Sequence, residues 1–288
     1  MKLILSICCV AMGLNSIAQQ KVITQATIST TTNVIAPDEE DASSVQQQGG
    51  AGFNFRNFGD GETKSTTYYK DAMVKTVIKT DMGRTTTIRN NDTKVTTTLM
   101  EIMGNKMGFY ASDDEQKEMK IKMDSMMQAR SAADTSQHKR TVSSSTASNV
   151  DIVYTEETKK IAGYNCKKAL VITTRILGLK DTTLAWYSPE IKFENLGYTG
   201  GLSGFGAVVS NSNGLEKING FVMRYEMKMR RNRQMIVEVT KIEIGKDLAA
   251  KEFEVPKDFD LKPMKEMQNM MGGRGVPGGG PGMQIIRN

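Results

Sequence analysis

The sequence predicts a mainly β fold built from antiparallel strands, with one or two helices. Residues 63–111 and 150–246 consist largely of strand-length runs rich in Thr, Val and Ile, which are residue types enriched in strands. Short polar breaks of hairpin length separate many of these runs. Residues 113–131 differ, because their apolar side chains recur at helical spacing. The pattern favours about ten strands and one main helix, as in a sandwich or barrel.

Residues 1–18 have the pattern of a cleavable export signal. Lys2 is followed by a mostly apolar run, and the small residues Ser16 and Ala18 occupy the −3 and −1 positions of a cleavage site. The apolar run is only about a dozen residues long, whereas a spanning helix needs roughly 20. We therefore expect an exported protein in the periplasm of a Gram-negative-type envelope, soluble or peripherally associated with a membrane.

The first strand is expected at 21–32, where β-branched residues dominate. Residues 33–60 are rich in Gly, Gln, Ser and acids, which indicates a loop or a disordered insertion. Val74, Thr76 and Ile78 alternate with their neighbours, as half-buried antiparallel strands require. The strands expected in this part of the chain after the first are 63–70, 73–80, 84–90, 93–101 and 105–111.

Residues 113–131 are expected to form the main helix, because acids stand at the front and apolar residues follow at helical spacing. The apolar residues are Met119, Ile121, Met123, Met126 and Met127. Residues 132–149 form a polar, low-complexity linker. We therefore interpret 113–149 as a helix and linker inserted into a single β-rich domain that spans 19–262.

The second half of that domain carries the remaining expected strands. These are 150–157, 161–174, 181–188, 220–231 and 233–246. Residues 195–214 form a Gly-, Ser- and Asn-rich excursion, and a helical turn is expected near Asp247 to Ala250. Residues 263–288 should form a short helix and then a disordered Gly/Pro-rich tail.

The charge of the chain is mildly basic. The formal net charge is +6, and removal of residues 1–18 takes away one Lys and no acid, which leaves +5. The charges are interspersed, and no dense basic tract with interleaved aromatics is present, so we expect no nucleic-acid partner. A basic balance of this size favours contact with an anionic membrane surface, although a solvated surface explains it equally well.

Cys166 is the only cysteine outside the export signal, so no intramolecular disulfide is expected. A catalytic thiol would need a positioned histidine, and the only histidine, His138, lies in the polar linker. We interpret Cys166 as a buried small hydrophobe. With a period of two it shares a strand face with Tyr164, Leu170 and Ile172.

Methionines gather in two groups, one in 119–127 and one near the C-terminus. The second group is Met264, Met267, Met270 and Met271. Thioethers are soft ligands that suit Cu(I), so a Met-rich Cu(I)-binding protein is one alternative. Methionines at helical spacing more often form an adaptable apolar face, which favours contact with a lipid or a partner instead.

No motif in the sequence indicates catalysis. The stretch GGLSGFG (200–206) lacks the strand–loop–helix context of a phosphate-binding loop, and Phe205 stands where a nucleophile elbow needs its second Gly. Neighbouring carboxylates such as Glu39 and Glu40 lie in loop contexts. We therefore expect a non-enzymatic protein with no catalytic residue, no metal ligand set and no cofactor.

Two short sequence motifs resemble those of a known family. They contain Gly163, Tyr164, Cys166, Lys168 and Ala169, followed by Trp186, Tyr187 and Pro189. Their order resembles the exported domain-of-unknown-function family 4412 and the related GLPGLI-type proteins. The resemblance covers roughly residues 60–262 apart from 113–149. The chain has INGFVMRYE where the GLPGLI-type proteins carry the motif for which they are named.

The resemblance implies the periplasmic lipoprotein-carrier fold, a curved antiparallel half-barrel sheet covered by helix around an apolar cavity. It implies binding of a lipid or a lipoprotein acyl chain, with contact to a membrane surface, and it supplies no catalytic residue. The expected lining of the cavity is Met119, Met123, Met126 and Trp186. The alternative is a structural or protein-interaction module whose core is filled by its own side chains. The sequence indicates no oligomeric state.

Overall fold

A computed structural model describes the parts of the chain that form the sheet and its immediate coverings. The described residues are 21–35, 61–81, 83–119, 121–122, 125, 149–174, 180–193, 214–229 and 233–266. The expected export signal at 1–18, most of the expected loop and linker, and the expected tail beyond 266 lie outside them. Those expectations stay predictions.

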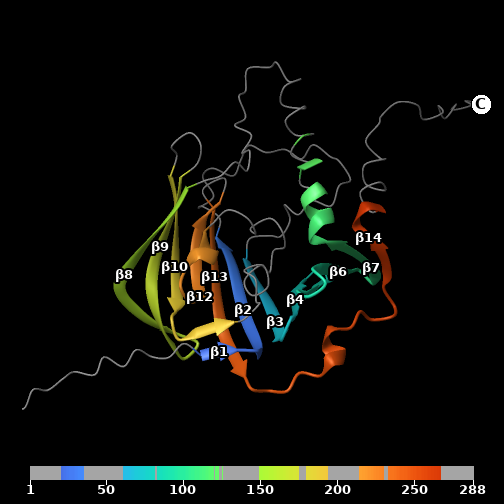
Figure 1. Ribbon diagram of the computed structural model, residues 1–288, viewed down its shortest axis with the longest axis horizontal. Coiled ribbons are helices and arrows are strands. Elements are labelled where there is room, and N and C mark those ends of the chain that lie inside the picture. The colour runs from blue at the N-terminus through green and yellow to red at the C-terminus, as the bar shows by residue number, and fades with distance from the viewer. Residues whose placement is uncertain are drawn as a thin grey trace, which may run out of the picture.

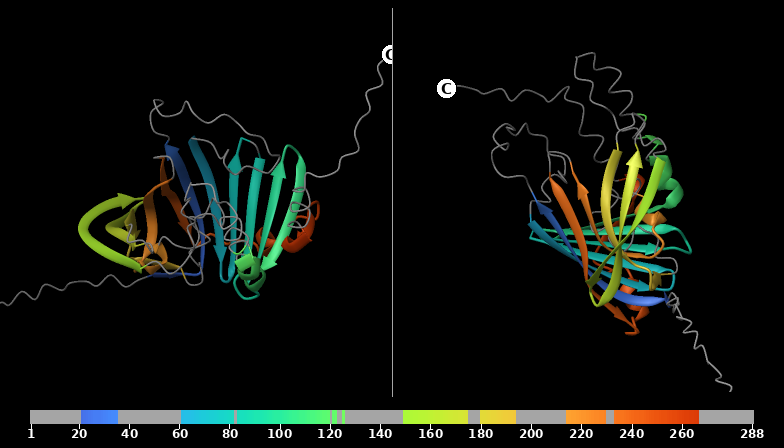
Figure 2. Two further views of the ribbon diagram at one scale, coloured as in Figure 1. Left: turned by 90° about the horizontal axis from the view of Figure 1, so that it is seen from above. Right: turned by 90° about the vertical axis from the view of Figure 1, so that its left-hand side faces the viewer.

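Twelve of the described strands form one large, strongly curved sheet (Figures 1 and 2). In spatial order they are β14 (Asp260–Pro263), β7 (Asn105–Ser112), β6 (Val95–Ile102), β5 (Gly83–Asn90), β4 (Met73–Thr80), β3 (Gly61–Lys70), β2 (Gln25–Ile35), β13 (Gln234–Ile244), β12 (Phe221–Lys228), β10 (Lys180–Ser188), β9 (Tyr164–Thr174) and β8 (Asn149–Ile161). Every neighbouring pair is antiparallel except β14 and β7. β1 (Lys21–Ile23) and β11 (Ile191–Phe193) form a separate parallel pair.

The expected fold class is confirmed: the protein is mainly β, with a curved, mostly antiparallel sheet and few helices. The sheet is open, since β14 and β8 stand at its two ends, so the strands do not close into a barrel. Helical residues occur at 113–119 and 264–266, and short 3₁₀ turns at η4 (Leu215–Lys217) and η6 (Ala250–Phe253).

Strand boundaries follow the sequence pattern with a few differences. β4 begins and ends where the alternation predicts. The first expected strand is instead split into β1 and β2 at Thr24, and β2 extends to Ile35, three residues into the expected loop. β11 and β14 were not expected, because strands of three and four residues are too short to show a period.

The strand registers divide the large sheet into two faces, and we call one of them the inner face. From β9 to β7 the inner face carries, one from each strand, Ala169, Ala185, Tyr225, Val237, Ile28, Thr67, Thr76, Thr87, Thr98 and Phe109. The residues that alternate with these form the outer face. A ligand held by the sheet therefore meets one of two chemically different surfaces.

Half of the inner face, from β9 to β2, is filled by the protein itself. Ile23 of β1, Ile191 of β11 and Leu215 of η4 belong to the same buried cluster as Val171 and Val237. Full burial of an aliphatic side chain of this size contributes about 1.5–3 kcal/mol. This cluster accordingly supplies much of the stability of the fold.

The outer face of the other half, from β4 to β7, is covered by the C-terminal segment. Lys75 Nζ on β4 donates a hydrogen bond to the Glu252 carbonyl at 2.7 Å, and Phe253 of η6 is buried. On β7, Gly108 is packed closely by two leucines, since a Cβ added there would lie 2.8 Å from Leu99 Cδ2 and 2.9 Å from Leu261 Cδ1 of the neighbouring β14. Figure 1 shows η6 and the helix that begins at 113 on opposite sides of this half.

Candidate ligand-binding site

The main helix begins directly after β7, where its first turn forms a capping box. The backbone N–H of Glu115 donates to Ser112 Oγ at 3.3 Å, and the backbone N–H of Ser112 donates to Glu115 Oε2 at 2.7 Å. This reciprocal pair satisfies two of the helix's free amide groups. Asp113, Asp114 and Glu115 also place negative charge at the positive end of the helix dipole. The helix therefore starts at a fixed residue.

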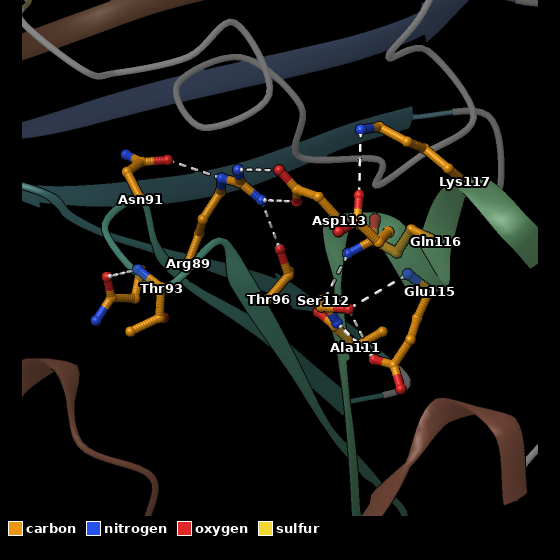
Figure 3. A network of polar contacts seen from close by, with 12 residues as sticks. Arg89, Asn91, Thr93, Thr96, Ala111, Ser112, Asp113, Glu115, Gln116 and Lys117 are labelled. Carbon is orange, nitrogen blue, oxygen red and sulfur yellow. Dashed lines mark hydrogen bonds and ion pairs between the residues drawn. The ribbon is translucent and has the colours of Figure 1, made fainter.

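A bidentate ion pair ties this helix start to the inner face. Arg89 of β5 donates to Asp113 through Nη1 to Oδ1 at 2.7 Å and through Nη2 to Oδ2 at 2.9 Å (Figure 3). Arg89 also donates to Thr96 Oγ1 at 3.1 Å and to Asn91 Oδ1 at 2.8 Å. Arg89 shares the inner face with Val74 and Thr96, so the helix leaves the sheet on that side.

The ion pair stabilises the charged form of both partners. The hydrogen bond and the positive charge of Arg89 hold the pKa of Asp113 below its usual range, and the hydrogen bond to Asp113 raises the pKa of Arg89. The side chain of Arg89 is 23% exposed and that of Asp113 is 30% exposed. An ion pair that is bidentate, hydrogen-bonded and partly buried contributes measurably to the stability of the fold.

The inner face beside this helix is a wall of methyl groups and hydroxyls. Met100 and Ala111 are buried there, and Thr87, Thr98 and Phe109 are half-buried. Each threonine presents a methyl group as well as a hydroxyl, so the wall combines apolar groups with hydrogen-bonding groups. It is suited to the flank of an extended apolar molecule.

Hydroxyl groups on the deeper part of this face add hydrogen-bonding capacity. Thr67 Oγ1 and Thr76 Oγ1 lie 3.0 Å apart within hydrogen-bond distance, and both side chains are buried. Thr30 Oγ1 is buried and has no hydrogen-bond partner within the described ranges. A buried hydroxyl without a partner costs free energy, and Thr30 stands on β2, in the half of the inner face that the protein fills itself.

Two of the four sequence-predicted lining residues, Met119 and Trp186, have described side chains, and they lie on opposite sides of the sheet. Met119 is half-buried in the helix, whereas the side chains of Met123 and Met126 lie outside the described residues. Trp186 alternates with Ala185 and pairs with Lys168 and Arg224, so it lies on the outer face. The sheet therefore separates Trp186 from the helix. The residue type alone does not show on which face of a strand an aromatic side chain lies, so the sequence did not indicate this position.

Sequence reasoning missed Arg89, Asp113 and Thr98 as residues of this site. The capping box could have been found, since Ser112 and Glu115 have the required spacing. The partner of Asp113 could not, because Arg89 is 24 positions away and only the hairpins between them bring the two side chains together.

Cys166 has no place in the candidate site, and its predicted burial is confirmed. The side chain is fully buried, and desolvation raises the pKa of the thiol to about 11. The thiol is therefore neutral at pH 7 and is no nucleophile under those conditions. Leu170 and Ile172, its predicted neighbours on the strand face, are only half-buried, whereas Ala169 and Val171 on the other face are fully buried.

The alternation along β9 is not interrupted, since Lys167 to Thr174 pair with β10 without a shift. The irregularity between Tyr154 and Thr158 lies in β8, whose residues 155–157 have no register partner on β9. Cys166 therefore differs from Leu170 and Ile172 in burial and not in strand face.

The described ranges contain no group of three or more His, Cys, Asp and Glu side chains that could hold a metal ion. Met267, Met270 and Met271 lie outside those ranges, so the Cu(I) alternative stays a prediction. None of the helices in the described part of the chain has the length and apolar character that a membrane crossing needs.

Comparison with known families gives one match. The model of a family described as a domain of unknown function, DUF4412, matches residues 70–259. This range begins at the end of β3 and ends before β14, so it contains most of the sheet and the start of the helix. No curated protein sequence matches the chain.

Three solved structures show a distant likeness. PNGF-II is 13% identical over 86% of this chain with a TM-score of 0.35, and the chain spans 32% of its length. The MucA/MucB complex of Pseudomonas aeruginosa is 8% identical with a TM-score of 0.34, covering 81% of this chain and 56% of that one. A putative outer membrane lipoprotein-sorting protein domain of Vibrio parahaemolyticus is 8% identical with a TM-score of 0.19, covering 80% and 89%. Scores this low carry no argument about ligand or activity.

Proposed function

The chain belongs to the DUF4412 family of domains of unknown function, and we propose that it is a non-enzymatic envelope protein that binds an apolar ligand. The proposed ligand is a lipid or the acyl chain of a lipoprotein. It lies along the inner face of β5 to β7, beside the helix that begins at Asp113. The proposal assigns no catalytic residue and no cofactor.

The observation that carries the proposal is the pairing of a methyl-rich wall with a helix fixed beside it. Thr87, Thr98 and Phe109 provide the wall, and the Arg89–Asp113 ion pair holds the helix on the same side. Each CH₂ group that an acyl chain buries contributes about 0.8 kcal/mol. A chain of about ten such groups would therefore bind without any charged contact.

The hydroxyls deeper on the inner face suit the polar end of such a ligand. A lipid ester or carbonyl group accepts hydrogen bonds, and the buried hydroxyls of Thr67 and Thr76 lie on β3 and β4, next to the proposed site. The mild positive charge and the expected export signal support a location in the periplasm, with transient contact to an anionic membrane surface when ligand is loaded or released.

A second candidate is a structural or protein-interaction module with a filled interior. The observation that favours it is the buried cluster of Ile23, Ile191 and Leu215, which already fills the inner face from β9 to β2. The two candidates differ at the other half of the sheet. A ligand-binding protein leaves the inner face of β5 to β7 open to a ligand, and a filled module does not.

We expect Thr98→Trp to reduce the fraction of ligand-bound protein at least about tenfold, because the indole occupies the space along the inner face. A tenfold loss corresponds to about 1.4 kcal/mol. The matched control is Thr97→Trp, since Thr97 is also half-buried on β6 but faces the outer side. Protein purified from its own envelope is measured by native mass spectrometry and by analysis of extracted lipid.

Wild type and Thr97→Trp should both retain an apolar ligand. Repeated recovery of wild type without any such ligand would favour the filled module. Equal retention by the two tryptophan variants would place the ligand elsewhere on the protein. Circular dichroism of both variants serves to exclude unfolding as the cause of a loss.

A further inference from the structure

The two edges of the large sheet are built differently. β14, at one edge, has four residues and ends in Pro263. β8, at the other edge, has 13 residues and contains neither Gly nor Pro. Proteins usually shorten an edge strand or place a proline in it, because its free backbone groups pair with other strands. The β14 edge is protected in this way, whereas β8 is a long edge strand that carries charged residues and an irregularity at 155–157 instead.

The backbone of β8 is available for pairing on its outer side. Within the described part of the chain, β8 has a sheet neighbour on one side only, namely β9, and Figure 2 shows it at the outer end of the curved sheet. Residues 156–160 are all exposed. Residues 155–157 also have no register partner on β9, so this stretch is incompletely paired even within the molecule.

The sign of the side-chain charge changes at the centre of this stretch, from negative to positive. Glu156 and Glu157 precede Thr158, and Lys159 and Lys160 follow it. When two copies of the strand pair antiparallel about Thr158, Glu156 lies opposite Lys160 of the second copy and Glu157 opposite Lys159. Symmetry repeats both contacts, which gives four opposite-charge pairs.

The charge order selects this register over its neighbours. A twofold axis through Glu157 would place that residue opposite itself, and an axis through Lys159 would do the same for Lys159. Like charges directly opposite each other destabilise a strand pair, whereas opposite charges stabilise it. Glu157 already contacts Lys168 of β9 at 2.7 Å, so in the pair it would lie between two lysines.

We propose that two copies of the chain associate through β8, antiparallel about Thr158, into a twofold-symmetric dimer with one continuous sheet. Main-chain hydrogen bonds provide the attraction, as in other cases of strand addition. The four charge pairs set the register and the choice of partner. This interface is separate from the inner face, so it does not depend on the proposed ligand.

The test is a charge exchange in the full chain, measured by sedimentation velocity in buffer of low ionic strength. E156K/E157K and K159E/K160E should each weaken dimerisation at least about tenfold, because every pair becomes a like-charge pair. An equimolar mixture of the two variants should form a heterodimer. The four substitutions combined in one chain keep the net charge and should restore the homodimer.

The wild-type dimer should also weaken between about 0.02 and 0.5 M salt, since exposed ion pairs are screened. A wild type that stays monomeric at concentrations up to about 0.5 mM would overturn the proposal, given the micromolar to millimolar affinity expected of so small an interface. A dimer that forms equally well in both double variants would also overturn it. Thermal unfolding of each variant checks that the fold is intact.

Discussion

Replacement of Tyr69 by alanine is expected to lower the free energy of unfolding by about 3–5 kcal/mol, the range seen for large aromatic residues in cores. Tyr69 is fully buried on β3, and its ring lies edge-on to Phe193 with the centroids 5.4 Å apart. The substitution leaves a cavity between the large sheet and β11. Urea unfolding followed by circular dichroism measures the loss.

The neighbouring Tyr68 provides a matched control. It lies on the outer face of the same strand and is half-buried, with the Lys75 ammonium 5.6 Å from the ring centroid. We expect Tyr68→Ala to cost about 1–2 kcal/mol, since an exposed cation–π contact contributes about 0.5–1 kcal/mol and the burial is partial. Equal losses for the two tyrosines would contradict the assignment of inner and outer faces.

Replacement of Asp113 by asparagine is expected to lower the free energy of unfolding by about 1.5–3 kcal/mol, the range for hydrogen bonds to charged groups. The variant keeps the size of the side chain but removes the charge that Arg89 contacts. The control is Asp114→Asn, which makes the same charge change one residue later. Asp114 is 90% exposed, so its replacement should change the stability by less than about 0.5 kcal/mol.

The contribution of the Arg89–Asp113 pair depends on pH. The pKa of Asp113 is lowered in the folded protein, so the unfolded chain binds the proton more tightly. The contribution is fully present above the ordinary pKa of an aspartate, about 3.9, and is lost as the pH falls through the lowered value. Asp113→Asn should therefore reduce the steepness of the acid unfolding curve, and an unchanged curve would contradict the role of the pair.

The strand content of the protein could be predicted from local pattern. Val74, Thr76 and Ile78 alternate with Lys75, Val77 and Lys79, and β4 begins and ends where the sequence pattern predicts. Hairpin-length breaks predicted the antiparallel order of β3 to β7, which the registers bear out. Such signals are local, because each depends on residues fewer than about ten positions apart.

The candidate site was less predictable, because it depends on which face of the sheet is the inner one. Adjacent tyrosines at 68 and 69 give no indication of which is buried, and the same ambiguity led to the inclusion of Trp186 in the predicted lining. The position of the C-terminal segment shows which face of β4 is the outer one, since Glu252 and Phe253 cover that face.

The central claim is that an apolar ligand lies along the inner face of β5 to β7. The most direct measurement uses a fatty acid with a photoreactive group in its acyl chain, which is cross-linked to the purified full chain and located by mass spectrometry of peptides. The account predicts saturable labelling at Thr87, Thr98 and Phe109, with competition by unlabelled fatty acid. Labelling confined to the outer-face residues Thr97 and Tyr110, or labelling that does not saturate, would contradict it.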